Sequence, residues 1–376
     1  MINRTFWEDK IDALWKEKNL IWIAGVRRSG KTTLCKNLRL PIYDCELGSV
    51  RLQLEDPETF FTNMKSPVIA LDEIHKLPDP SNVLKIATDH FPKIKIIATG
   101  SSSIQALNKF KDSLTDRKRI LFFTPMNSVD LKDFGLSLNE RMIKGGLPPA
   151  ILSERFNENF YQDWIDSFWA KDIQELFKVE KRHGFIKFFE LLALQSGDLF
   201  EATRFSSECE VSRPTIQKYL DILELSFIAY RLRPFHKNSG KEVVAAPKVY
   251  FFDTGFISYF RGISQLSSEL KGHYWKNLVL NELLSFYHPD SIYYWRDKNQ
   301  TEIDFILKLR GRDPVTIECK LQAKSFATNR VESFRKIHNG NENWCIATDI
   351  KDSYSKDING HQIRFLNIHH LKDLVK

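Results

Sequence analysis

The feature that most constrains the fold is a glycine-rich segment near the start of the chain. An apolar run from Ile21 to Ala24 leads directly into GVRRSGKTT, which has the spacing Gly-x4-Gly-Lys-Thr. A strand, a glycine-rich turn and a helix in this order form a phosphate-binding loop, because the N–H groups of the turn and the helix N-terminus all face an anion. The segment therefore predicts an α/β fold with a nucleotide site at the end of its first strand.

Each residue of this loop has an expected role. Gly25 and Gly30 allow the tight backbone. Lys31 would reach the β and γ phosphates of ATP, and Thr32 would place its hydroxyl on Mg²⁺. The other loop residues expected to line the nucleotide are Arg27, Arg28, Ser29 and Thr33. A glycine turn with a chance lysine is the alternative that this motif alone leaves open.

A second motif lies further along the chain, in SPVIALDEIHKLPD. The apolar run from Val68 to Leu71 predicts another buried strand, which ends in the carboxylates Asp72 and Glu73. At the carboxyl end of a parallel strand beside the loop, Asp72 would hold Mg²⁺ through water and Glu73 would polarise the attacking water. This pair indicates an ATP hydrolase rather than a protein that only binds nucleotide.

A third apolar run, IKIIATGSSS, ends in small hydroxyl residues. These residues are expected to lie near the γ-phosphate. Thr99 or Ser101 would sense that phosphate, and Ser101 is the preferred candidate.

The segments GVRRSGKTTL, LDEIHKLPD and IATGSSS resemble the AAA-type ATPases that occur with a C-terminal domain of unknown function in bacteria and archaea. The resemblance runs along nearly the whole chain. Family members often carry Gly-Arg after the sensor strand, whereas SLTDR has Asp116 at the glycine position and Arg117 at the arginine position. The resemblance implies that Arg117 or Arg119 enters a neighbour's site, which requires a homo-oligomer. A surface arginine is the alternative.

A domain boundary is expected near Gly145, Gly146, Pro148 and Pro149, which cannot continue a regular helix. Beyond it, apolar residues recur three and four apart, which is typical of amphipathic helices. The expected units are an ATPase domain (1–136), a helical connector (137–185), a winged-helix domain (186–255) and a C-terminal domain (265–376).

The winged helix is predicted from the order of elements after residue 205. A short helix, a turn at Val211 and a second helix capped by Ser212, with Pro214 in its first turn, precede an apolar strand. A polar loop and a return strand follow, which completes the motif. On DNA, its exposed residues would contact phosphates and a groove. These residues are Arg213, Gln217, Lys218, Lys237 and Lys241. Protein docking is the alternative.

The stretch TEIDFILKLRGRDPVTIECK predicts two strands joined by a polar turn. Phosphodiester hydrolysis needs carboxylates that hold Mg²⁺ or Mn²⁺ and a cation that positions water. Asp304 and Glu318 are the expected metal ligands, and Lys320 would orient or deprotonate the water. Glu282, from the preceding helix, would bind the metal directly or through water. A solvated hairpin without chemistry is the alternative.

This Asp and Glu-x-Lys arrangement resembles the restriction-endonuclease-like nuclease fold, which is also how the C-terminal domain of the ATPase family looks. The resemblance implies a second α/β domain and leaves three functions open. The first is an ATP-driven protein that acts on nucleic acid, preferably DNA, and carries a metal-dependent nuclease. The second is a nucleotide-switched DNA- or protein-binding module whose nuclease-like domain is inert. The third is an ATPase that acts on protein partners.

Composition says more about the cellular compartment of the protein than about the reaction it catalyses. The net charge of +7 permits a polyanionic partner. The five cysteines show no CxxC spacing, which argues against zinc and against a disulfide framework and favours a reducing cytosol. No segment has the pattern of a signal peptide or the apolar length of a membrane span, so a cytoplasmic protein without membrane contact is expected.

Overall fold

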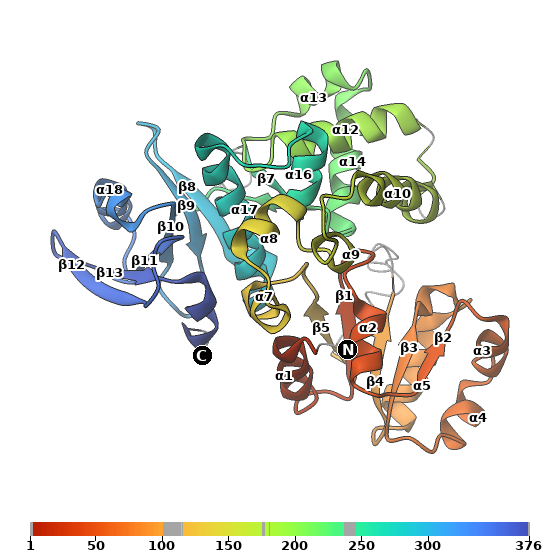
Figure 1. Ribbon diagram of the computed structural model, residues 1–376. Helices are drawn as coiled ribbons and strands as arrows, with labels where there is room; N and C mark the ends of the chain where they lie inside the picture. The colour runs from red at the N-terminus through yellow and green to blue at the C-terminus, as the bar shows by residue number, and fades with distance from the viewer. Residues whose placement is uncertain are drawn as a thin grey trace.

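The computed structural model describes residues 3–100, 114, 116–174, 177–179, 181–236 and 246–374. Its N-terminal part is a five-stranded parallel sheet in the order β2-β3-β4-β1-β5 (Figure 1). The strands are β1 (Leu20–Ala24), β2 (Ile42–Asp44), β3 (Val68–Asp72), β4 (Lys95–Thr99) and β5 (Lys118–Phe122). The apolar run before the glycine-rich loop is the interior strand β1, which is buried along its whole length, as a parallel strand covered on both faces must be.

Helices cover both faces of this sheet. On one face, α1 and α2 pack on Ile21 and Ile23 of β1. On the other face, α5 contributes Val83, Leu84 and Ala87 to the hydrophobic cluster that also contains Leu20 and Trp22. The helices are α1 (Thr5–Leu14), α2 (Lys31–Asn37), α3 (Gly48–Gln53), α4 (Pro57–Thr62), the 3-10 turn η1 (Ile74–Lys76) and α5 (Pro80–His90).

The described residues of the middle part form helices and one antiparallel pair of strands, β6 and β7. Its core is aromatic: the Trp164 ring stacks on Phe168 and Phe252 at centroid distances of 5.0 and 5.6 Å. The elements are α7 (Ser128–Phe134), α8 (Leu138–Lys144), α9 (Pro148–Ile151), α10 (Glu158–Phe168), the π-helix η3 (Trp169–Gln174), α12 (Arg182–Leu194), α13 (Ala202–Glu208), α14 (Arg213–Leu225), β6 (Ala229–Leu232), β7 (Lys248–Phe251) and α16 (Thr254–Arg261). Ser212 caps α14 through the N–H of Thr215, as expected. The assignment of this part to a winged helix stays a prediction.

The C-terminal part is a six-stranded mixed sheet in the order β12-β13-β11-β10-β9-β8. The hairpin predicted from the sequence is present as the antiparallel pair β9 and β10, whereas β11 runs parallel to β10. The elements are α17 (Ser268–Phe286), η4 (Pro289–Ser291), β8 (Ile292–Arg296), β9 (Glu302–Leu307), β10 (Val315–Lys320), η5 (Ala323–Ser325), α18 (Asn329–Arg335), β11 (Asn343–Ala347), β12 (Tyr354–Ile358), β13 (His361–Leu366) and η6 (Ile368–Leu374). A mixed sheet with α17 on one face is an α/β domain; the restriction-endonuclease-like assignment stays a prediction.

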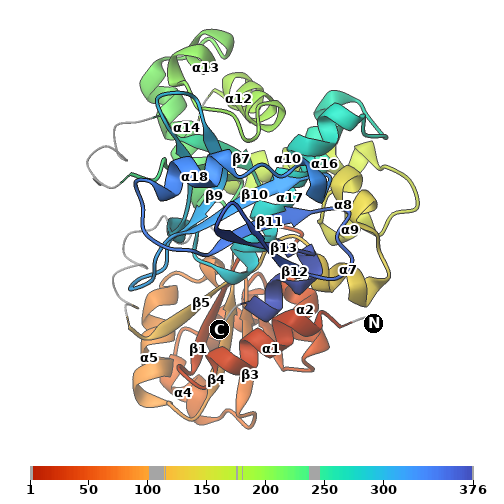
Figure 2. The same cartoon turned by 90° about the vertical axis from the view of Figure 1, so that its left-hand side faces the viewer.

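Buried polar contacts join the three parts. The guanidinium of Arg4 binds both carboxylate oxygens of Asp130 in α7, and the side-chain amide of Asn277 in α17 donates to the carbonyl of Phe251 in β7 at 2.8 Å. At the end of the chain, the ring of His369 lies 3.2 Å from the carbonyl of Ser128, so η6 rests beside α7 (Figure 2). Within the described ranges, no helix is both long enough and apolar enough to span a bilayer.

Candidate functional sites

The glycine-rich loop joins β1 to α2 and needs glycine at two positions. A Cβ atom on Gly25 would lie 2.3 Å from the carbonyl oxygen of Phe123, so a side chain there would collide with the backbone that follows β5. Gly30, directly before α2, has a φ of +99°, a conformation that costs other residues strain. Both glycines therefore hold the backbone where the sequence expects a phosphate cradle.

Lys31 lies inside this loop. Its ammonium donates to the carbonyls of Gly25 and Val26 at 2.8 and 3.0 Å, and burial lowers its pKa. The nearby hydroxyl of Ser29 is buried and has no hydrogen-bond partner in the described part of the chain. A buried cation and an unpartnered hydroxyl within one tight loop fit the phosphates of ATP.

The ends of three elements meet beside Lys31. The hydroxyl of Thr32 donates to Asp72 Oδ2 at 2.8 Å, and the hydroxyl of Thr99, at the end of β4, donates to Asp72 Oδ1. A hydroxyl beside a carboxylate supplies hard oxygen ligands, the kind that Mg²⁺ prefers, and nucleotide phosphates complete its coordination in such sites. The residues present therefore fit Mg²⁺ with ATP.

Glu73 follows Asp72 with a left-handed backbone, φ +50°, which is strained for a residue with a side chain. Its N–H donates to the hydroxyl of Thr99 at 3.3 Å, and its carboxylate lies 3.1 Å from His75 Nδ1. Burial opposes ionisation of Glu73, but the His75 hydrogen bond and the charge of Lys31 outweigh it, so the pKa of Glu73 lies below its ordinary value. The side chain is thus anionic at neutral pH.

The middle part contacts the loop directly, which the sequence reasoning missed. Arg27 Nη1 donates to Asp172 Oδ2 at 2.6 Å and to the carbonyl of Ser167 at 2.8 Å, and Trp164 donates to the carbonyl of Arg27. A small cavity of about 60 Å³ lies here, between Lys31, Glu73 and residues 171 and 172 of η3. No spacing in the sequence signals this contact, because it joins residues more than a hundred positions apart.

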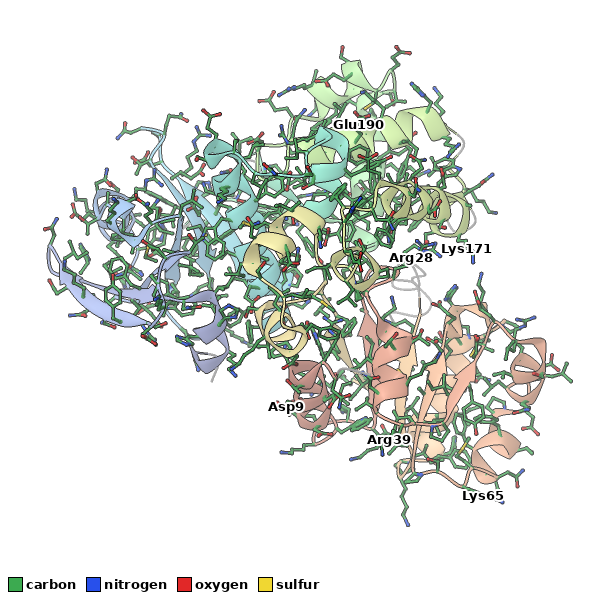
Figure 3. The ribbon with its side chains drawn as sticks, viewed as in Figure 1. Asp9, Arg28, Arg39, Lys65, Lys171 and Glu190 are labelled. Carbon is green, nitrogen blue, oxygen red and sulfur yellow. The ribbon has the colours of Figure 1, made fainter. Side chains whose placement is uncertain are left out.

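Figure 3 shows Arg28 and Lys171 at the junction between the N-terminal sheet and the middle helices. The guanidinium of Arg28 lies 5.5 Å from the centre of the Phe160 ring, and Thr33 is exposed on α2. Ser101, the preferred γ-phosphate sensor, lies outside the described residues. The alternative, Thr99, is bonded to Asp72 and so belongs to the same cluster.

Arg117 and Arg119, the two candidates for an arginine that enters a neighbour's nucleotide site, lie away from this cluster. Arg117 precedes β5 and forms two hydrogen bonds with Asp89, at 2.8 and 3.1 Å, and Arg119 binds Glu17. Because the strands are parallel, the start of β5 is at the opposite end of the sheet from the loop. Neither arginine reaches the nucleotide site of its own subunit, so only a role in a neighbour's site stays predicted.

In the C-terminal part, the structure brings Asp304, Glu318 and Lys320 together and adds two further cations. Asp304 Oδ1 lies 2.5 Å from the ammonium of Lys276, and Oδ2 accepts the N–H of Cys319 at 2.9 Å. Glu318 Oε2 lies 2.5 Å from Lys320 and 3.1 Å from Arg330. Asp304 and Glu318 are therefore both paired with basic side chains.

The electrostatics of these two carboxylates differ. Burial opposes ionisation of Asp304, but Lys276 and Lys320 outweigh it and lower its pKa. Burial and the charge of Asp304 raise the pKa of Glu318. Among the residues that the structure describes, no group of three or more His, Cys, Asp or Glu side chains could hold a metal ion. Both carboxylates are paired with cations here, and the role of Asp304 and Glu318 as ligands of Mg²⁺ or Mn²⁺ stays a prediction.

Glu282 is not part of this cluster. Its buried carboxylate accepts the N–H and the hydroxyl of Ser128 at 2.9 and 2.7 Å, at the N-terminus of α7. Lys276 and Glu282 are six residues apart on α17, about 9 Å along the axis and on different sides of the helix, so only Lys276 faces Asp304. The expected metal-ligand role of Glu282 is therefore replaced by a contact between two parts of the molecule. Burial raises the pKa of Glu282 to about 7.

The residues expected to bind DNA are only partly described. Arg213 and Lys218 are exposed on α14, and Gln217 is half-buried. Lys237 and Lys241 lie outside the described residues, so the expected wing cannot be compared with the structure.

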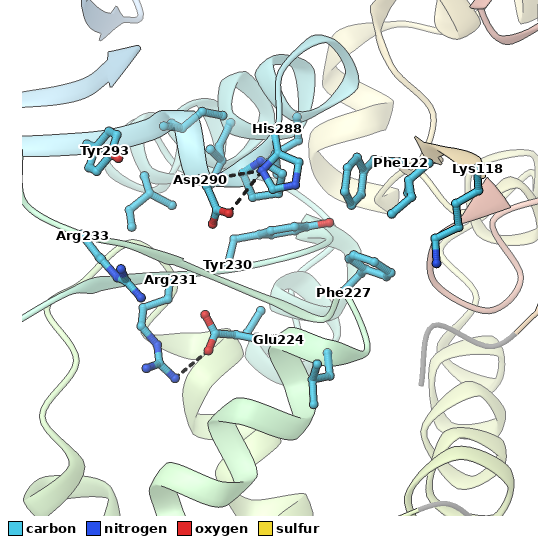
Figure 4. A pocket seen from close by; sticks show the side chains of 18 of the residues that line it. Lys118, Phe122, Glu224, Phe227, Tyr230, Arg231, Arg233, His288, Asp290 and Tyr293 are labelled. Carbon is cyan, nitrogen blue, oxygen red and sulfur yellow. Dashed lines mark hydrogen bonds and ion pairs between the residues drawn. The ribbon is translucent and has the colours of Figure 1, made fainter. Parts of the chain in front are cut away.

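A larger cavity of about 660 Å³ lies between β5, the turn from α14 to β6, and the end of α17 (Figure 4). Phe122, Phe227 and Tyr230 form much of its apolar wall, and Glu224 binds Arg231 at 2.6 Å. Burial raises the pKa of Glu224 to about 7. The sequence reasoning did not predict this cavity, because all three parts of the chain contribute to it.

Three family models match consecutive segments. Residues 17–131 match an AAA domain, residues 135–267 match a domain of unknown function (DUF8612), and residues 271–366 match another (DUF4143). Uncharacterised proteins of Mycobacterium bovis and Mycobacterium tuberculosis are each 27% identical over 314 residues, which cover 80% of this chain and 70% of theirs.

Two solved structures resemble the chain at 15% identity. One is a Walker-type ATPase of Pyrococcus abyssi, with a TM-score of 0.45 over 69% of this chain and 96% of the other. The second is the RuvB Holliday junction branch migration motor of Thermotoga maritima, with a TM-score of 0.31 over 65% of this chain and 95% of the other.

Proposed function

The chain carries an AAA-type P-loop ATPase domain followed by a DUF4143 domain, and from this premise we propose that it binds ATP with Mg²⁺ and hydrolyses the ATP. The observation that carries the proposal is the contact of Thr32 with Asp72 at 2.8 Å beside the buried ammonium of Lys31. Together they supply a cation for phosphate and oxygen ligands for Mg²⁺.

In the proposed reaction, Lys31 leaves the loop carbonyls and offsets charge on the β and γ phosphates. Thr32 and Asp72 hold Mg²⁺, which when bound neutralises charge on the same phosphates. Glu73, anionic because His75 and Lys31 stabilise its charge, orients the attacking water and accepts its proton. The proposal includes a homo-oligomer in which Arg117 of one subunit enters the nucleotide site of the next. Full ATP turnover by a monomer would contradict this role of Arg117.

Lys31→Ala tests the nucleotide site. The variant is expected to lose binding of a fluorescent ATP analogue and to lose phosphate release, because it lacks the buried ammonium that the carbonyls of Gly25 and Val26 hold inside the loop. Lys36→Ala, which removes an exposed lysine of the same helix, is the matched control and should retain both. Binding by Lys31→Ala as tight as that of the parent protein would overturn the proposal.

We further infer that the ATPase acts on nucleic acid, with DNA preferred, and that the middle part is a winged helix. The support is the net charge of +7 and the exposure of Arg213 and Lys218 on α14. Lys218→Glu should weaken DNA binding and reduce its salt dependence, and an unaltered salt slope would favour protein docking.

For the C-terminal part, a restriction-endonuclease-like fold is proposed, and the cation-bound carboxylates favour the reading in which it binds without cutting. The second candidate, a metal-dependent nuclease, rests on the Asp304, Glu318 and Lys320 cluster. Incubation of labelled DNA and RNA with Mg²⁺ or Mn²⁺ separates the two. Cutting that disappears in Asp304→Ala would establish the nuclease, and intact substrate alongside measurable ATP hydrolysis would leave a binding module.

A further inference from the structure

The C-terminal sheet carries a groove that neither site above uses. It has a volume of about 670 Å³ and runs along β12 and β13 and the loops that follow β10 and β11. Tyr354, at the start of β12, is 48% exposed although it is aromatic. Its ring stacks on Phe365 at a centroid distance of 4.9 Å and an interplanar angle of 9°. Phe365 therefore covers one face of the Tyr354 ring and fixes its orientation.

The charged residues of this groove leave an excess of positive charge. Lys324, Lys351 and Lys356 line it, and none of the three has a side-chain hydrogen bond or ion pair within the part of the chain that the structure describes. Two carboxylates, Asp349 and Asp352, also line it, so the three lysines leave a net charge of +1; Asp349 accepts the N–H of Ala323 at 2.9 Å. An open aromatic ring with unpaired lysines around it is the combination that unpaired bases and their phosphates recognise.

The strand register places this groove on the same face of the sheet as Glu318. Glu318 pairs with Cys345, Cys345 with Phe365, and Phe365 with Tyr354. Directly paired residues project to the same face, and neighbouring strands are about 4.8 Å apart. Tyr354 thus lies about 14 Å from Glu318 across three strand spacings of that size.

We propose that this face binds single-stranded nucleic acid. One base stacks on Tyr354, Lys324, Lys351 and Lys356 contact the phosphates, and the strand continues toward Lys320 and Arg330 beside Glu318. A duplex would meet the lysines but offers no free base to the ring, so the exposed Tyr354 favours a single strand. The inference rests on the proposed action on nucleic acid and names its substrate class.

The test is fluorescence anisotropy of labelled oligo-dT and of a duplex of equal length, with the full chain at several salt concentrations. Tyr354→Ala should weaken single-strand binding about 5- to 150-fold, the range for the loss of one stacked base. Tyr354→Trp should restore it. Lys356→Gln should flatten the salt slope by about 0.7 for single strands. Lys298→Gln, on the turn between β8 and β9 at the other edge of the sheet, is the matched control.

Three results would overturn the inference. The parent protein would not bind single strands, Tyr354→Ala would bind them as tightly as the parent, or the parent would prefer the duplex and only Lys356→Gln would weaken that binding. Equal binding by Tyr354→Ala with loss in Lys218→Glu would leave the action on nucleic acid standing and remove this surface. Failure of ATP hydrolysis in the parent, with binding that still depends on Tyr354, would remove the ATPase proposal alone.

Discussion

At the scale of single residues, the backbone of Glu73 decides what its carboxylate can reach. Continuing the strand would carry its side chain past the loop, whereas the left-handed turn and the bond to Thr99 keep it beside Lys31 and His75. The motif predicted this meeting because the ends of parallel strands share one edge. It could not predict Asp172 or Lys276, since their contacts arise from packing between distant segments.

Glu73→Gln is expected to bind ATP as the parent does and to hydrolyse it at least about 100-fold more slowly, because the amide cannot accept the proton of water. The pKa of Glu73 lies below its ordinary value, so in the parent its protonation should not limit turnover between about pH 5.5 and 8. Phosphate release and analogue binding measure the two effects. Hydrolysis by Glu73→Gln at the parental rate would exclude Glu73 as the base.

At the scale of elements, α17 connects the C-terminal sheet to the middle part through its polar side chains. Lys276 forms an ion pair with Asp304 of the C-terminal sheet, and Asn277 donates to the carbonyl of Phe251 in β7. The carboxylate of Glu282 accepts the N–H of Ser128 in α7. The sequence predicted the helix from its apolar spacing, but it assigned Glu282 to a metal. Periodicity identifies a buried face, whereas the partner of a buried polar group depends on which element packs there.

Glu282→Leu should therefore destabilise the protein by about 1–3 kcal/mol, because it leaves the buried N–H of Ser128 without an acceptor. Glu282→Gln, which keeps one carbonyl oxygen, should lose less. Thermal unfolding with and without EDTA measures this. Two results together would instead support the metal-ligand hypothesis. EDTA would lower the melting temperature of the parent, and without metal Glu282→Leu would melt at the same temperature as the parent.

At the scale of the whole molecule, the cavity of about 660 Å³ lies where all three parts meet, and its partly buried Glu224 should make their packing sensitive to pH. The folded-state pKa of Glu224, about 7, is above that of an unfolded chain. Its stabilising contribution is therefore complete below about pH 4.5 and is lost as the pH rises through about 7.

Glu224→Gln removes this titration. The melting temperature of the parent should fall more steeply between about pH 4.5 and 7 than that of the variant, while Glu282, which titrates in the same direction, contributes equally to both. Melting curves of the two proteins across this range give the comparison. If the melting temperatures of the two proteins change with pH in parallel, the ionisation of Glu224 does not destabilise the fold.

The bond between Arg27 and Asp172 makes ATP affinity a shared property of two parts of the chain. If phosphate draws Arg27 away from Asp172, breaking that bond lowers the affinity for ATP by some factor. Thermodynamic reciprocity then requires bound ATP to weaken the contact of Arg27 with the middle helices by the same factor. Asp172→Asn should then bind ATP more tightly while transmitting less of its presence to the middle part. Hydrogen exchange of η3 with and without ATP would register that transmission, and identical exchange in both proteins would argue that the two parts are not coupled through this bond.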